Sequence, residues 1–136
     1  MELKELSSIT SALNVLYVED DITLREQNSE FFKELFNIVD IAVDGEEALK
    51  LYKIKNFDIV ITDINIPKIN GLSMIKLMQQ EKQDQKFLIT TVYKEEELKN
   101  QLEELNLKHF LTKPISTKWL LEKIEDIINE LDEVAC

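Results

Sequence analysis

The sequence predicts a doubly wound α/β domain, in which a five-stranded parallel sheet carries helices on both faces. Short apolar stretches rich in β-branched residues alternate five times with stretches whose apolar residues recur at helical spacing. No internal repeat or low-complexity tract interrupts this alternation. Consecutive parallel strands require right-handed crossovers, and these carry the connecting helices over both faces of the sheet.

The five stretches predicted as strands are short, apolar and bounded by turn residues. They cover residues 14–18, 38–43, 57–63, 86–91 and 109–112. The third is an almost uninterrupted apolar run, which suits a strand buried on both faces of a parallel sheet. It ends at Asp63, and Pro67 and Asn70-Gly71 follow as turn signals. We therefore expect Asp63 to stand exposed where this strand becomes a loop.

The five helices are predicted from apolar residues at helical spacing and from residues that favour helix starts. They run over about 23–36, 45–53, 72–80, 93–105 and 117–131. Thr23 and Glu26 are placed as a capping box for the first helix, and Asp44 as the cap of the second. Ser116 or Thr117 is expected to cap the last.

The length and composition suit one compact domain, because 136 residues with 44% hydrophobic content can build one core. We expect this domain to span residues 14–133. An N-terminal extension, 1–13, precedes it and has roughly helical spacing of its apolar residues, and a short tail, 134–136, follows. No effector domain follows the last helix, so the chain is expected to be a stand-alone module or a piece of a longer protein.

The composition also disfavours several classes of function. A net charge of −11 without a basic run argues against direct binding of nucleic acid or of an anionic membrane. The apolar stretches are too short to cross a bilayer and no secretory signal opens the chain, so we expect a cytoplasmic protein. One cysteine, Cys136, and one histidine, His109, argue against a disulfide framework and a zinc site.

The residues suited to chemistry all follow predicted strands at their carboxyl ends. They are Glu19, Asp20, Asp63, Thr91 and Lys113. Taken singly, each has a simpler explanation as a turn, cap, strand or surface residue. If the first and third strands are neighbours, as in the flavodoxin-like order 2-1-3-4-5, three carboxylates converge on one crevice. Their repulsion favours a hard divalent cation, Mg²⁺ or alternatively Mn²⁺, and Lys113 adds a positive charge suited to a phosphoryl group.

Together these motifs resemble the receiver domain of two-component response regulators, of the chemotaxis-regulator type. The resemblance covers the chain from about Asn14 to Leu131. It rests on Val18-Glu19-Asp20-Asp21, Asp63-x-x-x-Pro67-x-x-x-Gly71, Thr91 and Lys113-Pro114. Four ordered motifs on the appropriate elements are far more specific than any one of them.

The resemblance implies a role for each of these residues. Asp63 would be the phosphorylated residue, and Mg²⁺ would be held by Glu19, Asp20, Asp63 and the main-chain carbonyl of Asn65. Thr91 would bind a phosphoryl oxygen and Lys113 would neutralise it. The Lys113-Pro114 peptide bond would be cis.

Two positions depart from the usual pattern of the family, and a third matches it. The acid pair begins with Glu19 where Asp is commoner, so this side chain would reach the metal directly or through water. The glycines that usually precede the fifth strand are missing, and Asn106 is expected to take the left-handed conformation in their place. Phe110 stands where the family carries a switching aromatic, although an ordinary apolar strand residue explains it as well.

The function implied is a phosphorylation switch rather than a metabolic enzyme. Asp63 would take the phosphoryl group of a phosphohistidine on a sensor histidine kinase or histidine phosphotransfer protein, and later lose it to water. Thr91 and Phe110 would then alter the surface of the fourth helix, fifth strand and fifth helix, which meets an unknown output partner or effector domain. Trp119, early in the last helix, is a candidate reporter or contact there.

Two other functions remain open at this point. One is a receiver-like interaction module that works without phosphorylation, which is expected to have lost the acids or the lysine that this chain keeps. The other is a phosphatase of the haloacid dehalogenase type, which needs a second Asp two residues after the first. This chain has Asn65 at that position.

The phosphorylated state is expected to be long-lived. In the family, the position after the threonine is usually small, and the next one flanks the path of the attacking water. Here they are Val92 and Tyr93, and both are bulky. Asn65 flanks the same path and could orient a water instead, but we expect steric closure to prevail.

Overall fold

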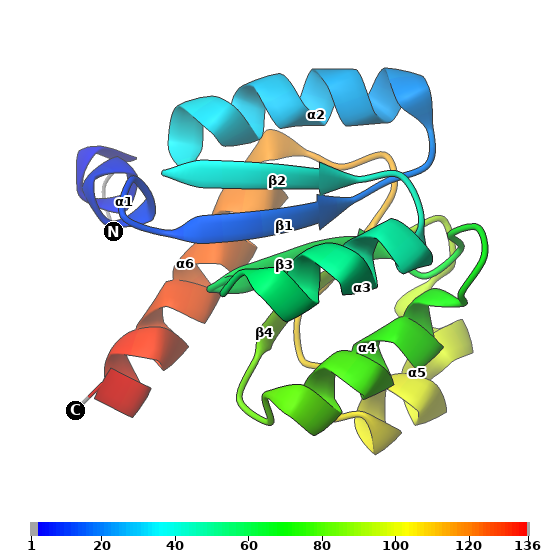
Figure 1. The fold of residues 1–136 in the computed structure, drawn as a ribbon. Coiled ribbons are helices and arrows are strands. Elements are labelled where there is room, and N and C mark those ends of the chain that lie inside the picture. Colours follow the sequence, from blue (N-terminus) through cyan, green and yellow to red (C-terminus); the bar gives the residue numbers. More distant parts are fainter. Residues whose placement is uncertain (1–2, 136) are drawn as a thin grey trace.

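A parallel sheet in the order β2-β1-β3-β4-β5 forms the middle layer of the structure (Figure 1). The computed structural model describes residues 3–135. The strands are β1 (Asn14–Val18), β2 (Ile38–Ala42), β3 (Ile59–Asp63), β4 (Lys86–Thr91) and β5 (Phe110–Thr112). The predicted fold class and strand order are therefore confirmed. Within residues 3–135, no helix has the length and apolar content needed to cross a membrane.

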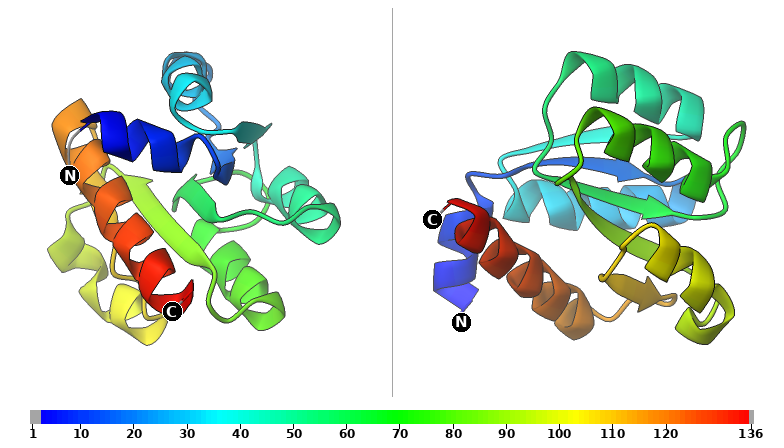
Figure 2. Two further views of the ribbon diagram at one scale, coloured as in Figure 1. Left: turned by 90° about the vertical axis from the view of Figure 1, so that its left-hand side faces the viewer. Right: turned by 90° about the horizontal axis from the view of Figure 1, so that it is seen from below.

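Helices cover both faces of this sheet, with α1, α2 and α6 on one face and α3, α4 and α5 on the other (Figure 2). Their bounds are α1 (Leu3–Thr10), α2 (Ile22–Leu35), α3 (Gly45–Ile54), α4 (Gly71–Glu81), α5 (Glu95–Glu104) and α6 (Thr117–Ala135). Successive strand residues point to opposite faces, so β1 sends Tyr17 into one core and Leu16 into the other. Both faces of the central strands are buried, which explains their continuous apolar runs.

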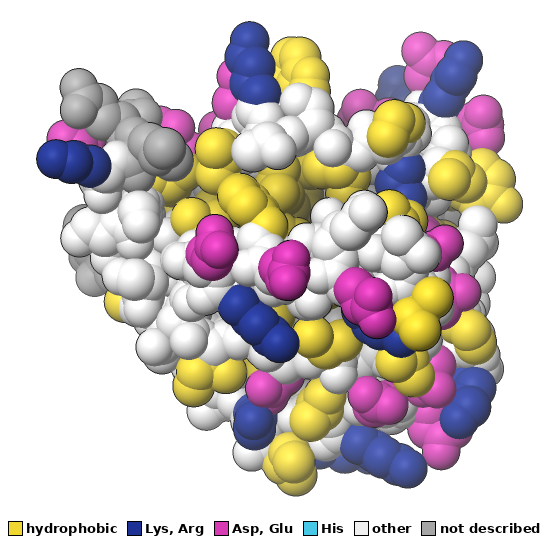
Figure 3. Space-filling view, turned by 90° about the horizontal axis from the view of Figure 1, so that it is seen from above, with side chains coloured by type: hydrophobic (Ala, Val, Ile, Leu, Met, Phe, Trp, Pro, Cys, Tyr) yellow, Lys and Arg dark blue, Asp and Glu magenta, His cyan; other side chains and the backbone are white. Residues whose placement is uncertain are grey.

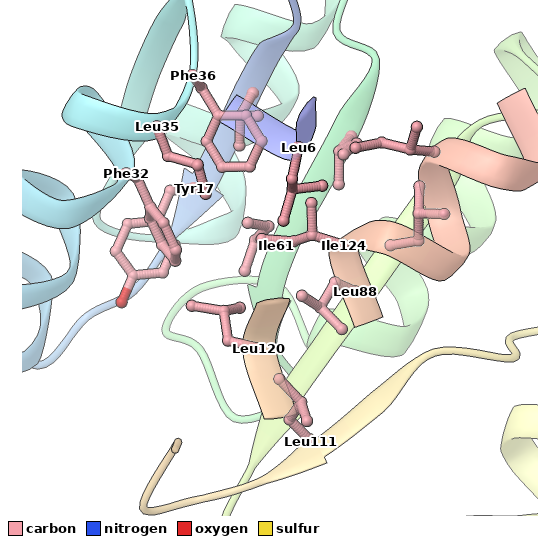
Figure 4. Close-up of a cluster of buried hydrophobic side chains, with 14 residues drawn as sticks. Leu6, Tyr17, Phe32, Leu35, Phe36, Ile61, Leu88, Leu111, Leu120 and Ile124 are labelled. Atoms are coloured by element: carbon pink, nitrogen blue, oxygen red, sulfur yellow. The ribbon is translucent and has the colours of Figure 1, made fainter. Parts of the chain in front are cut away.

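The leading segment forms a helix that belongs to the packed core. Leu6 of α1 is buried against the α2 and α6 side, in the same cluster as Phe36 and Ile124 (Figure 4). The chain then passes directly into β1, and the amide of Asn37 donates to the carbonyl of Leu13 (2.9 Å). The extension thus closes the core near the amino ends of the strands.

Two helix starts differ from the sequence prediction. The capping box of Thr23 and Glu26 is wrong, because α2 begins at Ile22 and Asp21 is its N-cap, accepting from the amide of Leu24 (3.0 Å). The extended backbone of Asp21, directly after the turn that follows β1, suits an N-cap. α5 begins at Glu95 rather than 93, because the amide of Tyr93 donates to the Thr91 hydroxyl (3.3 Å) and keeps the chain in a turn.

Three other local predictions are confirmed. Asp44 caps α3 and accepts from the amide of Glu47 (2.8 Å). Asn106 has a φ of 56°, and the Lys113-Pro114 peptide bond is cis.

On the face that carries α2, acidic and basic side chains are interspersed, and the described residues form no extended basic area there (Figure 3).

Candidate functional site

The carboxyl ends of four strands bring the predicted site residues to one edge of the sheet. β1 lies beside β3, with Val18 opposite Thr62, and β3 lies beside β4, with Asp63 opposite Thr90. β4 pairs in turn with β5, where Thr91 is opposite Thr112. The residues that follow these strand ends therefore meet although they are far apart in sequence.

Lys113 lies at the centre of this group. Its ammonium nitrogen is 2.7 Å from Oε1 of Glu19 and 2.8 Å from Oδ2 of Asp63. The backbone amide of Lys113 donates to the carbonyl of Thr91 (2.7 Å), which continues the β4–β5 pairing past the last strand residue. One cation thus bridges two carboxylates contributed by β3 and by the turn after β1.

Burial shapes the charge of this network. Glu19 is only 1% exposed, and burial raises its pKa above the ordinary value, with the hydrogen bond from Lys113 offsetting part of the effect. Burial also opposes the charged form of Lys113, but its hydrogen bonds to Asp63 and Glu19 prevail and raise its pKa. Lys113 therefore stays protonated across the physiological range, whereas Glu19 is harder to ionise than an exposed glutamate.

Asp63 is held on both sides and is buried, so the expectation that it stands exposed is wrong. The amide of Asn65 donates to its Oδ1 (3.1 Å), while Lys113 covers Oδ2. Gly71 lies behind it, and a Cβ there would be 2.6 Å from the Asp63 carbonyl oxygen. The loop folds back this closely because residue 71 has no side chain, and the amide of Gly71 donates to the carbonyl of Ile64 (2.9 Å).

The acid turn after β1 has a supporting residue that sequence reasoning missed. Arg25, one turn into α2, donates from Nη1 to the main-chain carbonyls of Glu19 (3.1 Å) and Asp20 (3.2 Å). The Asp20 side chain is exposed, and it makes no hydrogen bond or ion pair with any residue from 3 to 135. The sequence pattern that could have predicted this contact is a basic residue, Arg25, about one helical turn after the acidic run Glu19-Asp20-Asp21.

The remaining predicted residues differ in burial. Thr91 is fully buried, and Phe110 is half-buried against the core on the α3, α4 and α5 side. Val92 and Tyr93 are 65% and 40% exposed, and Asn65 is also exposed. Thr91 and Asn65 adjoin the centre through main-chain hydrogen bonds, Thr91 with Lys113 (2.7 Å) and Asn65 with Asp63 (3.1 Å).

Comparison with known proteins identifies the architecture. The family model for the response regulator receiver domain matches residues 15–125. The chain belongs to this family. A chemotaxis protein CheY from Treponema pallidum is 30% identical over 118 residues, which are 84% of this chain and 81% of that protein.

Two solved structures are similar to this receiver domain in both sequence and shape. The N-terminal domain of an uncharacterized protein from Wolinella succinogenes is 33% identical with a TM-score of 0.80, and the alignment covers 90% of this chain and 99% of that one. The CheX-CheY-BeF3-Mg²⁺ complex from Borrelia burgdorferi contains a chain that is 29% identical with a TM-score of 0.79, covering 92% and 96% respectively.

The oxygen-rich donor set of the receiver site fits a hard divalent cation. The side chains of Asp20 and Asp63 and the carbonyl of Asn65 supply oxygen only, as Mg²⁺ prefers. Both carboxylate oxygens of Glu19 already accept hydrogen bonds, from Lys113 (2.7 Å) and from the amide of Asp21 (3.3 Å). In the described part of the chain, no three His, Cys, Asp or Glu side chains form a metal cluster.

Proposed function

We propose that this receiver domain accepts a phosphoryl group on Asp63 from the phosphohistidine of a sensor histidine kinase or histidine phosphotransfer protein in the cytoplasm. The observation that carries the proposal is the Lys113 bridge between Asp63 and Glu19 at the carboxyl edge of the sheet. It places a cation beside a buried carboxylate, where charge develops when a phosphoryl group arrives.

In the transfer, a carboxylate oxygen of Asp63 forms the new bond to phosphorus while the phosphorus–nitrogen bond of the phosphohistidine breaks. The imidazole leaves with the electron pair of that bond. The Asn65 amide and Lys113 orient the Asp63 carboxylate before attack, and Lys113 neutralises charge on the transferred group. Water later attacks the same phosphorus and returns Asp63 and inorganic phosphate, so the domain modifies itself and turns over no metabolite.

The residues for a bound metal follow from the donor set. Asp20, Asp63 and the carbonyl of Asn65 would hold Mg²⁺, or Mn²⁺ in its place, and Glu19 would contribute through water because both its oxygens are engaged. When bound, the cation supplies positive charge for the phosphoryl oxygens. The Borrelia CheY complex with beryllofluoride and Mg²⁺ supports this assignment.

Phosphorylation would bias an existing equilibrium rather than create a new fold. In the described state the Thr91 hydroxyl accepts from the amide of Tyr93 (3.3 Å). Thr91 turning towards the phosphoryl group would break that bond and free space for Phe110. The surface of α5, β5 and α6 would then respond, towards an output partner or effector domain. Trp119 lies on it with 55% exposure.

Mass spectrometry of the intact protein after incubation with Mg²⁺ and acetyl or carbamoyl phosphate tests the phosphoacceptor role. The parent chain is expected to gain one labile phosphoryl group. No gain would instead favour an interaction module that works without phosphorylation. Steady turnover of a phosphate monoester would indicate a phosphatase of the haloacid dehalogenase type.

The switch is tested separately by adding Mg²⁺ and beryllofluoride. Amide shifts in α5, β5 and the start of α6 are expected to change, together with Trp119 fluorescence. Unchanged shifts and fluorescence would reject the switch while leaving the phosphoacceptor role intact.

A further inference from the structure

The loop between β3 and α4 rests on the first turn of α3. The amide of Gly45 donates to the carbonyl of Pro67 (3.3 Å). Lys68, with a positive φ of 72°, places its ammonium 3.4 Å from Oδ2 of Asp44. Ile69 packs over Gly45 itself. A segment two to four residues beyond Asn65 is therefore seated on a different helix.

Gly45 leaves no room for a side chain in this contact. A Cβ there would lie 2.9 Å from the Cβ of Ile69 and 3.0 Å from its carbonyl oxygen. Because one neighbour is a main-chain oxygen, the loop itself would have to move. The need for glycine is steric, since no positive φ is recorded for it.

The position of this loop bears directly on the phosphoacceptor. The same loop carries Asn65, whose amide donates to Oδ1 of Asp63 (3.1 Å). Only Ile66 lies between Asn65 and Pro67, the residue bonded to Gly45. A shift at the α3 contact therefore changes the orientation of the carboxylate, and it also moves the Asn65 carbonyl.

We propose that Gly45 is a positioning residue for the site: by letting the loop seat on α3, it sets the place of Asn65 and through it the carboxylate of Asp63. The inference rests on the proposed function, because it gives Asp63 and the Asn65 carbonyl their roles. Gly45 touches neither the reacting atoms nor the metal ligands.

Close packing against Gly45, rather than the ion pairs of Lys68, is the main reason that the β3–α4 loop lies on α3. The Lys68 side chain is 58% exposed in its ion pairs with the buried Asp44 (3.4 Å) and the exposed Glu46 (3.6 Å). Ion pairs whose ammonium group faces solvent contribute little to a structure. Removing the lysine charge should therefore disturb the site much less than adding one carbon at Gly45.

The test compares Gly45→Ala with Glu47→Ala, a matched control in the same helical turn whose exposed side chain has no recorded contact with the loop. In metal-free protein, Gly45→Ala is expected to shift the backbone amide resonance of Asn65. The Kd for Mg²⁺ should rise about 3- to 10-fold by calorimetry, with a similar fall in the rate of phosphorylation by acetyl phosphate, since a displacement of 1 Å costs about 10²-fold. Lys68→Met and Glu47→Ala should match the parent.

An unshifted Asn65 amide together with a parental Mg²⁺ affinity in Gly45→Ala would overturn the proposal. So would equal shifts in the Glu47→Ala control. Ile69→Gly removes the same contact from the loop side and should shift the Asn65 amide even if the alanine variant does not fold. If the parent accepts no phosphoryl group, the proposed function fails, while the metal-free amide shift still decides the role of Gly45.

Discussion

At each end of its strands, the sheet carries one charged side chain that contacts two partners. The carboxyl edge is where the strands finish, and the amino edge is where they begin. At the carboxyl edge, Lys113 lies between Glu19 and Asp63. At the amino edge, Glu130 of α6 lies 3.0 Å from Lys86 at the start of β4 and 3.0 Å from His109 just before β5. In both networks one residue contacts two others, but the central residue is a cation, Lys113, at the carboxyl edge and an anion, Glu130, at the amino edge.

Charge balance and burial distinguish the proposed phosphoacceptor site from a structural brace. At the carboxyl edge, Lys113 contacts two buried carboxylates, those of Glu19 and Asp63, so negative charge is in excess. The amino edge is balanced, because Lys86 neutralises Glu130 when His109 is uncharged. It also lines a cavity of about 380 Å³, where three acids (Asp84, Glu104 and Glu130) face two lysines (Lys86 and Lys108), so the charges nearly cancel. The presence of a cavity alone therefore does not identify the candidate functional site of this molecule.

Removing one acid from each edge should give the largest contrast. Asp63→Asn is expected to fold but to accept no phosphoryl group, because an amide lacks the nucleophilicity of a carboxylate. Glu130→Gln should be phosphorylated like the parent. Intact mass after acetyl phosphate and Mg²⁺ measures both. An acid-stable, base-labile phosphoryl group on the same peptide of Asp63→Asn would refute the assignment.

Removing one lysine from each edge should separate the two networks in stability. Lys113→Met leaves two buried carboxylates unpaired and should lower the free energy of unfolding by about 3 kcal/mol at pH 7. Lys86→Met should cost less than about 1 kcal/mol, because Glu130 keeps His109 and some solvent contact. Urea unfolding measures both, and equal losses would contradict the comparison.

The loss in Lys113→Met should also shrink as the pH falls. Burial raises the pKa of Glu19, so this group becomes neutral at a higher pH than an exposed glutamate does. A raised carboxyl pKa favours the folded state at acid pH and disfavours it as pH rises through that pKa. Repeating the urea series at pH 5 checks this sign.

Trimming Val92 and Tyr93, which follow the end of β4, should have a smaller effect, confined to the lifetime of the phosphorylated state. Val92→Ala and Tyr93→Ala open the approach for water and are expected to speed loss of the phosphoryl group by about 10-fold. The measurement is the decay of phosphorylated protein in Mg²⁺, with the parent as reference. If neither variant decays faster, crowding by these residues does not set the lifetime.

The smallest effect is expected at the amino edge and has the opposite pH dependence. Burial opposes ionisation of Glu130, but hydrogen bonds from His109 and Lys86 prevail and lower its pKa below 4.5. The stability gained is present above the unfolded pKa and lost as pH falls through the folded one. Glu130→Gln should therefore cost about 0.5–1 kcal/mol at pH 7 and less at pH 3.5 by urea unfolding. A gap that widens in acid would contradict this explanation.

Local patterns in the sequence determine most of the architecture. Apolar runs and helical spacing predicted every strand, because side-chain periodicity reflects which faces are buried. Strand ends followed by polar residues predicted that Glu19, Asp63 and Lys113 would meet, since parallel strands end at one edge. Asn106 and Asp44 were predictable because turn and cap preferences act within a few residues.

Only the tertiary structure decided features that depend on contacts between distant segments. The Lys113 bridge buries Glu19 and Asp63, although an acid at a strand end is exposed by default. Seating of the β3–α4 loop on Gly45 requires α3 and that loop to lie side by side, which no local pattern encodes. The same holds for Leu6 in the core. Burial and close packing arise only when distant segments of the chain come together. The sequence therefore places the charged residues along the chain, and the fold decides which of them contact one another in a buried environment.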